Sequence, residues 1–297
     1  MHPVRSALLA LSLSTAPLAM SVPVFMTVTL CAGSAFADEA EGHYRMGLTH
    51  KRNGKIADAI REVKEAVRLR PDHAAAWMTL GGLERQQNDL AGALLAYERV
   101  IVLSPQHQQA YALAGAALVH QQKYESAVAR LQKAIELDKT DTTSAANLGM
   151  ALRKLNRSPE AIKVMEEAVK RKPDDPDLLN NLGVALRHER RYEEAIANFQ
   201  HALEKRPEDL ELVRNLAVSL RGLERFKDAI PYYERYLAKK ANDVGMLYDL
   251  ANCYEKMGDN PNAVRVYKRY VDAIAAKDPA AAERGRKRIT EIEATAF

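Results

Sequence analysis

The chain has 297 residues, of which 47% are hydrophobic and 28% are charged, a balance that excludes a wholly disordered or low-complexity fibrous protein. The 43 lysines and arginines slightly outnumber the 39 aspartates and glutamates, which gives a formal net charge of +4. They form no dense basic block, so we expect no nucleic-acid partner. Two cysteines, Cys31 and Cys253, are too few for a disulfide framework.

The first 37 residues differ in character from the rest of the chain. No charged residue occurs between Ser6 and Ala37. Ala35 and Ala37 form the small-x-small pattern that signal peptidases accept. We therefore predict a secretory signal over residues 1–37, cleaved after Ala37, and an exported, periplasmic mature protein. The alternative is an uncleaved N-terminal membrane anchor, because the apolar span is long enough to cross a bilayer.

The next part of the chain repeats with a period of 34 residues. Alanine recurs at one phase without insertion or deletion, at Ala59, Ala93, Ala127, Ala161, Ala195, Ala229 and Ala263. Glycine recurs at a second phase, at Gly47, Gly81, Gly115, Gly149 and Gly183. So regular a repeat predicts an array of seven units. Their ranges are 40–73, 74–107, 108–141, 142–175, 176–209, 210–243 and 244–277.

Each unit has the pattern of two helices. In the fifth unit, Leu178, Leu182 and Leu186 belong to one apolar stripe at helical spacing, and a second stripe starts at Tyr192. We expect Gly183 to lie where the two paired backbones meet. After the last unit, Asp278 precedes a charged helical stretch, so we predict a polar capping helix over residues 278–294 and a short tail to residue 297.

These residues resemble the tetratricopeptide repeat family. The second unit carries the family signature most completely, at Trp77, Leu80, Gly81, Ala93, Tyr97 and Pro105. The resemblance covers all seven units. It implies an all-α fold, a right-handed superhelical solenoid of helix pairs. It also implies a non-enzymatic protein–protein interaction scaffold that holds partner segments on its concave face.

In this family the concave groove is lined by the side of each first helix that faces away from the packing stripe. Nine polar residues of units four to six occupy such positions: Asn147, Arg153, Lys154, Asn180, Asn181, Arg187, Arg214, Asn215 and Arg221. An asparagine amide offers a donor and an acceptor to the backbone of an extended peptide, and arginine binds carboxylates. We predict that these residues bind an extended polar or acidic segment of a partner. The alternative is that the asparagines bond neighbouring helices and the arginines are merely solvated.

Most of the tyrosines lie between Tyr232 and Tyr270. Core packing explains much of this cluster, but Tyr232 and Tyr248 are candidates for a second protein-binding surface. A rival function therefore is an assembly factor that associates with itself or docks onto an envelope machine for pili, secretion or polysaccharide export. A third is a basic groove that holds an anionic polysaccharide.

The sequence offers little catalytic chemistry. His188-Glu189 begins a zinc-protease string, but Tyr192 stands where the second histidine belongs. We find no glycine-rich phosphate loop and no Gly-x-Ser-x-Gly elbow. Cys253 lies among apolar residues, as an inert buried thiol does. We therefore expect no enzyme activity, no metal and no cofactor.

Overall fold

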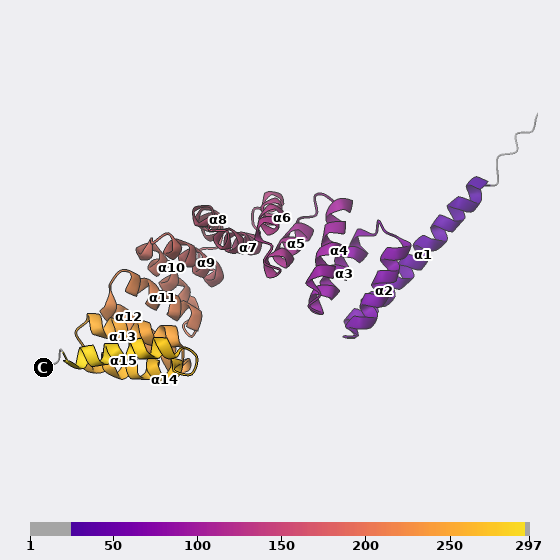
Figure 1. The fold of residues 1–297 in the computed structure, drawn as a ribbon. Coiled ribbons are helices and arrows are strands. Elements are labelled where there is room, and N and C mark those ends of the chain that lie inside the picture. Colours follow the sequence, from indigo (N-terminus) through magenta and orange to yellow (C-terminus); the bar gives the residue numbers. More distant parts are fainter. Residues whose placement is uncertain (1–24, 295–297) are drawn as a thin grey trace, which may run out of the picture.

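The computed structural model describes residues 25–294, with side chains from residue 37 onward. Within this range all the regular elements are helices, fifteen in number. They follow one another in pairs along a curved path (Figure 1). The all-α solenoid predicted from the repeat is therefore confirmed.

The first eight helices are α1 (Phe25–Arg52), α2 (Ile56–Leu69), α3 (Ala74–Gln86), α4 (Leu90–Leu103), α5 (Gln108–His120), α6 (Tyr124–Leu137), α7 (Thr142–Lys154) and α8 (Ser158–Arg171). The others are α9 (Pro176–His188), α10 (Tyr192–Lys205), α11 (Leu210–Gly222), α12 (Phe226–Lys239), α13 (Val244–Lys256), α14 (Asn260–Ile274) and α15 (Pro279–Ala294).

The two helices of a unit approach closely because a small residue of the first faces a large residue of the second. In α9, a Cβ atom added to Gly183 would lie 2.7 Å from the ring carbon Cε1 of Phe199. Phe199 itself has no exposed surface. A larger side chain at residue 183 would separate the helices, as the sequence predicted.

The turn inside each unit repeats one backbone feature. A residue with positive φ recurs every 34 positions, at Gly54, Asn88, Gln122, Asn156, Arg190, Glu224 and Gly258. Glycine adopts this conformation at no steric cost, whereas a residue with a bulky side chain loses about 1 kcal/mol or more there. The turns at Gln122, Arg190 and Glu224 are therefore strained.

The chain ends with the predicted capping helix. The Asp278 carboxylate accepts a hydrogen bond from the Ala281 N–H at 2.8 Å and so caps the start of α15. Ala282 and Ile292 are buried, and α15 packs on α14. The outer side of α15 carries charged residues, which covers the last repeat with a polar surface.

Most of the predicted signal, residues 1–24, lies outside the described residues, and its remainder forms the start of α1. Helix α1 passes through Ala37 without a break. Among the residues that the structure describes, none of the helices combines the length and the apolar content that crossing a membrane requires. Cleavage after Ala37, membrane anchoring and export all stay predictions.

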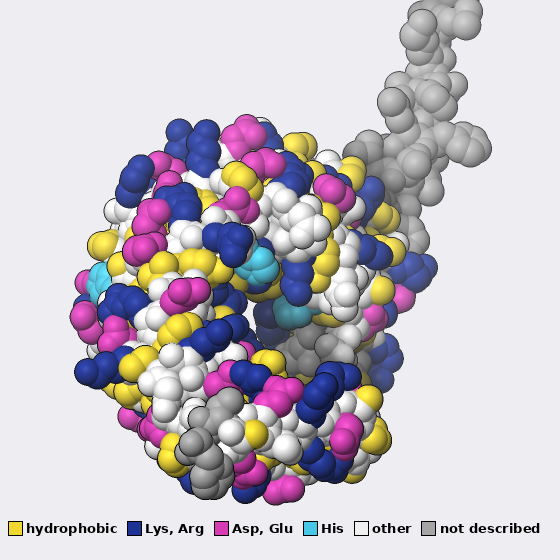
Figure 2. Space-filling view, turned by 60° about the vertical axis from the view of Figure 1, so that its left-hand side comes forward, with side chains coloured by type: hydrophobic (Ala, Val, Ile, Leu, Met, Phe, Trp, Pro, Cys, Tyr) yellow, Lys and Arg dark blue, Asp and Glu magenta, His cyan; other side chains and the backbone are white. Residues whose placement is uncertain are grey.

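Viewed from the end that comes forward in Figure 2, the molecule surrounds a central opening, and lysine and arginine side chains gather around it. The first helices of successive units meet near the middle of the chain, where α7 contacts both α5 and α9. The predicted groove residues of units four to six belong to α7, α9 and α11.

Candidate functional site

Three arginines from successive first helices form the centre of the candidate site. Arg153 lies in the last turn of α7, Arg187 in the last turn of α9 and Arg214 in the first half of α11. All three are half-buried. A cation in the last turn of a helix is favoured by the helix dipole, so two of the three are well placed locally.

These arginines take part in no close polar contact within the described part of the chain. None of Arg153, Arg187 and Arg214 forms a hydrogen bond or ion pair with any described residue. Burial and then the charges of Arg214 and Arg153 lower the pKa of Arg187. Burial lowers the pKa of Arg153, and Glu211 partly offsets this effect. The cluster is thus partly desolvated and self-repelling, and an incoming anion would relieve both costs.

Two further titratable residues lie on the solvent side of the cluster, and of these Lys154 adds a positive charge. Lys154 and His188 are exposed at the ends of α7 and α9. Burial lowers the pKa of His188, and the charges of Arg153 and Arg187 lower it further. His188 is therefore mostly neutral near pH 7, and its charge depends on what occupies the site.

A hollow of about 530 Å³ continues the site towards the C-terminal units. Its lining includes four cations and one acid, namely Arg187, Arg190, Arg221, Lys256 and Glu224. The aromatic rings of Tyr192 and Phe226 also border it. A lining with four cations and one acid suits a polar chain that carries carboxylates.

Asn147 and Asn181 keep their amide groups available. Both are half-buried, and neither forms a hydrogen bond with a described residue. Asn147 also lines a separate hollow of about 430 Å³ between α5 and α7. These two asparagines therefore retain the donor and acceptor that the sequence assigns to backbone recognition.

Asn215 and Asn180 are already engaged with each other. Only 1% of Asn215 is exposed, and its Nδ2 donates to Asn180 Oδ1 at 2.9 Å. Asn180 Nδ2 in turn donates to Glu211 Oε1 at 3.3 Å. For these two residues the structure therefore corresponds to the alternative considered from sequence, a bond between helices, because burial places Asn215 out of reach of a ligand in the groove.

Arg221 also differs from its counterparts in the preceding units. Its Nε donates to Tyr233 Oη at 3.2 Å and lies 3.4 Å from Asp249 Oδ2. The Tyr233 hydroxyl donates to the same Asp249 oxygen at 3.2 Å. Arg221 thus belongs to a network that joins units six and seven, although its side chain still reaches the hollow.

The two candidate tyrosines have different environments. Tyr248 is 47% exposed, and its ring centroid lies 5.4 Å from that of Tyr270 and 6.0 Å from that of Tyr267. It borders a hollow of about 370 Å³ shared with Arg284 and other residues of α13–α15. Tyr232 is half-buried against the core. Tyr248 is the more accessible of the two.

Arg190 is a residue of the site that the sequence pattern did not indicate. This residue occupies the left-handed position of its turn, with φ of 60°, and borders the hollow beside Arg187. An arginine at a position that suits glycine or asparagine is a detectable signal once the turn position within the repeat is known. Strained residues of this kind concentrate at functional sites.

The remaining chemical candidates are buried or dispersed. Cys253 has no exposed surface, and burial raises its pKa to about 12, which makes the thiol unreactive. Among the described residues, no three histidine, cysteine, aspartate or glutamate side chains come together in a way that could hold a metal ion.

Comparison with known proteins gives the fold a family. A family model described as Tetratricopeptide repeat matches residues 44–108, 147–209 and 214–282. A second, described as Anaphase-promoting complex, cyclosome, subunit 3, matches residues 86–168. No curated protein matches the sequence significantly.

Three solved structures of similar shape are distant from this chain in sequence. The C-terminal part of a TPR repeat-containing protein from Cytophaga hutchinsonii is 20% identical, with a TM-score of 0.64, and the match covers 82% of this chain and 98% of that one. YrrB, described as a TPR protein with an unusual peptide-binding site, is 22% identical over 62% of this chain and 95% of its own, with a TM-score of 0.55. PilF of Pseudomonas aeruginosa is 17% identical over 69% of this chain and 93% of its own, with a TM-score of 0.56. At these identities the likeness shows the fold alone.

The family model matches more than half of the chain, and the chain therefore belongs to the tetratricopeptide repeat family.

Proposed function

We propose that this protein is a non-enzymatic scaffold, exported to the periplasm, that binds an extended acidic or polar segment of a partner protein in its concave groove. The tetratricopeptide fold supports a protein–protein interaction scaffold. The finer assignment is supported by one observation above all. Arg153, Arg187 and Arg214 are half-buried together and form no hydrogen bond or ion pair with a described residue.

The energetics of this cluster favour a carboxylate ligand. A hydrogen bond to a charged group contributes about 1.5–3 kcal/mol, more than a neutral one. The cost of desolvating Arg187 has already been incurred in the unbound protein, so a ligand carboxylate gains most of that bond. Arg190 and Lys256 extend the positive lining of the hollow and favour a segment with several acids over a single charge.

The backbone of the bound segment would be held by amides. Asn147 and Asn181 lie one repeat apart on α7 and α9 and are unbonded. Each can accept from one peptide N–H and donate to one peptide C=O regardless of side chain. This combination selects extended chains with acidic character rather than one specific sequence.

The direct test measures binding of fluorescent peptides to the purified chain lacking residues 1–37. The probes are an extended Glu/Ser/Gly peptide and its Lys/Ser/Gly counterpart, titrated by anisotropy. We expect the acidic peptide to bind and its affinity to fall as salt rises. Arg153→Ala/Arg187→Ala should weaken it about 100-fold, and Asn147→Ala/Asn181→Ala about 10-fold, at unchanged helical content.

A matched control removes two cations away from the groove. Lys227 and Lys239 are exposed on α12 without ion pairs among the described residues. Lys227→Ala/Lys239→Ala therefore makes the same change in net charge and should leave the affinity within about twofold. Equal losses in both double variants, or tighter binding of the lysine peptide, would refute the proposed site.

The rival function is self-association or docking through the tyrosine-rich end, and the exposure of Tyr248 beside the α13–α15 hollow favours it. Sedimentation at increasing concentration, with wild type and Tyr248→Ala, measures it directly. A mass that rises with concentration only in wild type would support the rival. An anionic polysaccharide that competes with the acidic peptide would instead support the polymer ligand.

The cellular side of the proposal rests on residues 1–37. Mass spectrometry of the protein from envelopes of the producing cells gives the N-terminus directly. A chain that starts at Asp38 would support export with cleavage. An intact N-terminus in the membrane fraction would support the anchor instead.

A further inference from the structure

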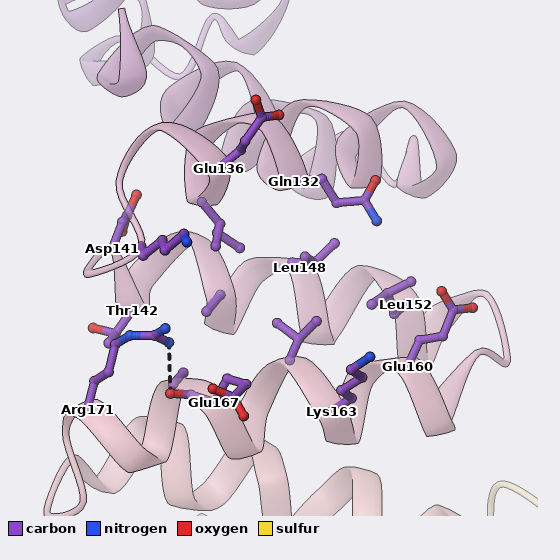
Figure 3. A pocket seen from close by; sticks show the side chains of 15 residues that line it. Gln132, Glu136, Asp141, Thr142, Leu148, Leu152, Glu160, Lys163, Glu167 and Arg171 are labelled. Carbon is purple, nitrogen blue, oxygen red and sulfur yellow. Dashed lines mark hydrogen bonds between the residues drawn. The ribbon is translucent and has the colours of Figure 1, made fainter.

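A second groove is lined by residues of α6, α7 and α8, and none of its lining residues belongs to the arginine cluster. Its walls are α6 and α8, and α7 forms its floor, as Figure 3 shows. The groove has a volume of about 570 Å³, within the range of sites that hold ligands or partner side chains. Leu148 and Leu152 of α7 line the floor, and Ile135 and Val164 line the walls.

One small residue distinguishes the unit that forms the floor of this groove. At the fourth position of the first helix, units two, three, five, six and seven carry Trp77, Tyr111, Leu179, Val213 and Leu247. The fourth unit carries Ala145, which lines the groove. In unit two, Trp77 packs between two apolar clusters, and its Nε1 donates to the Pro71 carbonyl at 2.9 Å. Ala145 leaves the corresponding space unfilled by this chain.

The wall beside this space is correspondingly more exposed. Ile135 occupies the position of Val67, Ile101, Leu237 and Val271, which are buried, and of Val169 and Leu203, which are partly buried. Ile135 itself is only partly buried. The groove therefore presents apolar surface that most other units of the same repeat cover with their own side chains.

The acidic residues of the groove are already engaged. Three of them form ion pairs, Glu136 with Lys133 at 2.7 Å, Glu160 with Arg157 at 2.6 Å and Glu167 with Lys170 at 2.7 Å. The fourth, Asp141, accepts hydrogen bonds from Ser144 and Gln108.

The basic residues of the groove are not neutralised in this way. Lys139 and Lys163 form no ion pair or hydrogen bond among the described residues. Arg171 donates only to the backbone carbonyl of Glu167, at 2.9 Å, as drawn in Figure 3. An apolar trough with unpaired cations along its edge complements an apolar stripe flanked by acids.

The length of the groove sets the form of its occupant. The α8 wall extends from Glu160 to Arg171, which is about three helical turns or 16 Å. The floor from Ala145 to Leu152 spans two turns. A helix that lies in such a trough presents anchors at positions i, i+3 or i+4, and i+7.

We propose that this second groove docks an amphipathic α-helix of a partner protein. A large apolar side chain of that helix fills the space beside Ala145, and acidic residues along its edge pair with Lys139, Lys163 and Arg171. This surface does not include the concave arginine cluster, so the protein would hold two partner elements at once, one in each groove.

The probe is a capped helical peptide of about 18 residues, or five turns, with a leucine stripe, one central tryptophan and glutamates on both flanks. A control peptide has the same sequence with lysine in place of each glutamate. Anisotropy and peptide helicity by circular dichroism are the readouts. We expect the glutamate peptide to bind and become helical, and the lysine peptide to bind at least tenfold more weakly.

Variants of the protein locate the binding. Ala145→Trp restores the residue type of unit two and should reduce the affinity at least tenfold while leaving the melting temperature unchanged or higher. Lys139→Glu/Lys163→Glu should reduce it similarly without altering the core. Lys227→Glu/Lys239→Glu is the control of equal charge, and Arg153→Ala/Arg187→Ala should have no effect because it changes only the concave face.

Three outcomes would overturn the proposal. The first is absence of glutamate-peptide binding at millimolar concentration. The second is equal affinity of wild type, Ala145→Leu and Ala145→Trp, with all three folded. The third is self-association of wild type that Ala145→Trp abolishes, because a second copy would then occupy the groove. Loss of acidic-peptide binding on the concave face alone would leave this inference standing.

Discussion

Units four and five and units six and seven use the same repeat positions for different purposes. At the twelfth position of the first helix, Arg153 and Arg187 have no bonding partner in the described chain. Arg221, at the same position in unit six, contacts Asp249 and Tyr233. In unit seven the position holds Glu255, which pairs with Arg288 of α15. One repeat position is thus available to a ligand in the middle of the solenoid and used structurally at its end.

Part of this difference follows from the large residue of the second helix that packs against the small glycine or alanine of the first helix. In unit five it is Phe199, which is fully buried and has no polar atom. In units six and seven it is Tyr233 and Tyr267, whose hydroxyls donate to Asp249 at 3.2 Å and to Glu255 at 3.1 Å. In units six and seven the hydroxyl of the core ring therefore binds the acid that neutralises or replaces the groove arginine.

The largest expected effect comes from breaking the network of the C-terminal units. Asp249→Ala leaves Arg221 and the Tyr233 hydroxyl without their acceptor, so we expect the free energy of unfolding to fall by about 2 kcal/mol. Asn181 occupies the same repeat position in unit five and is unbonded. Asn181→Ala is therefore the matched control and should change stability by less than about 0.5 kcal/mol. Equal losses in urea denaturation would contradict the comparison.

The turns of the two regions should respond to reciprocal substitutions. Arg190 has φ of 60° and Gly258 has φ of 73° at equivalent positions. Arg190→Gly should stabilise the protein by about 1 kcal/mol, and Gly258→Arg should destabilise it by a similar amount, because glycine is unstrained there and arginine is not. Thermal melting measures both. If Arg190→Gly also weakens binding of the acidic peptide, then the strained arginine contributes to binding.

Replacing Arg187 and replacing Arg221 should change the free energy of unfolding by smaller amounts, with opposite signs. Arg187→Met removes a cation repelled by Arg153 and Arg214 and keeps the apolar stem, so stability should rise by about 0.5 kcal/mol. Arg221→Met removes a cation that is paired, so stability should fall by about the same amount. Chemical denaturation at low ionic strength gives the best resolution. Identical signs would show that the middle cluster is not strained electrostatically.

The smallest effect is a pH dependence. The pKa of His188 is lowered in the folded protein by burial, Arg153 and Arg187, and burial and Arg70 lower that of His73. The unfolded chain regains a pKa near about 6.5, so it binds protons more readily and stability falls as pH drops below that value.

Peptide affinity should change in the opposite direction. A bound carboxylate raises the pKa of His188, so binding of the acidic peptide should tighten as pH falls from 7 to 6. His188→Gln is expected to flatten this dependence. A pH response that persists in His188→Gln would assign it to another group.

Some features of the site could be read from the sequence. The spacing of alanines and glycines predicts the helix pairs, and the arginines recur in phase with them. The sequence could not show whether Asn181 and Asn215 are equally buried or equally available for binding. Both occupy the sixth position, yet Asn215 is buried and bonded to Asn180 while Asn181 is half-buried and unbonded. How deeply each lies depends on the packing of the neighbouring units, which the pattern within one unit does not contain.

The sequence by itself determined the repeat, the two helices of each unit, their close approach at glycine and the polar cap at the end. These follow from short-range periodicity and residue size, which act within one unit or between neighbours. Only the tertiary structure decided which cations find a partner and where a groove opens. Arg153 responds to Glu211 two units away, and the second groove needs α6, α7 and α8 together. Such relations depend on how far each unit rotates against the next, and that rotation is set by the summed packing of many side chains.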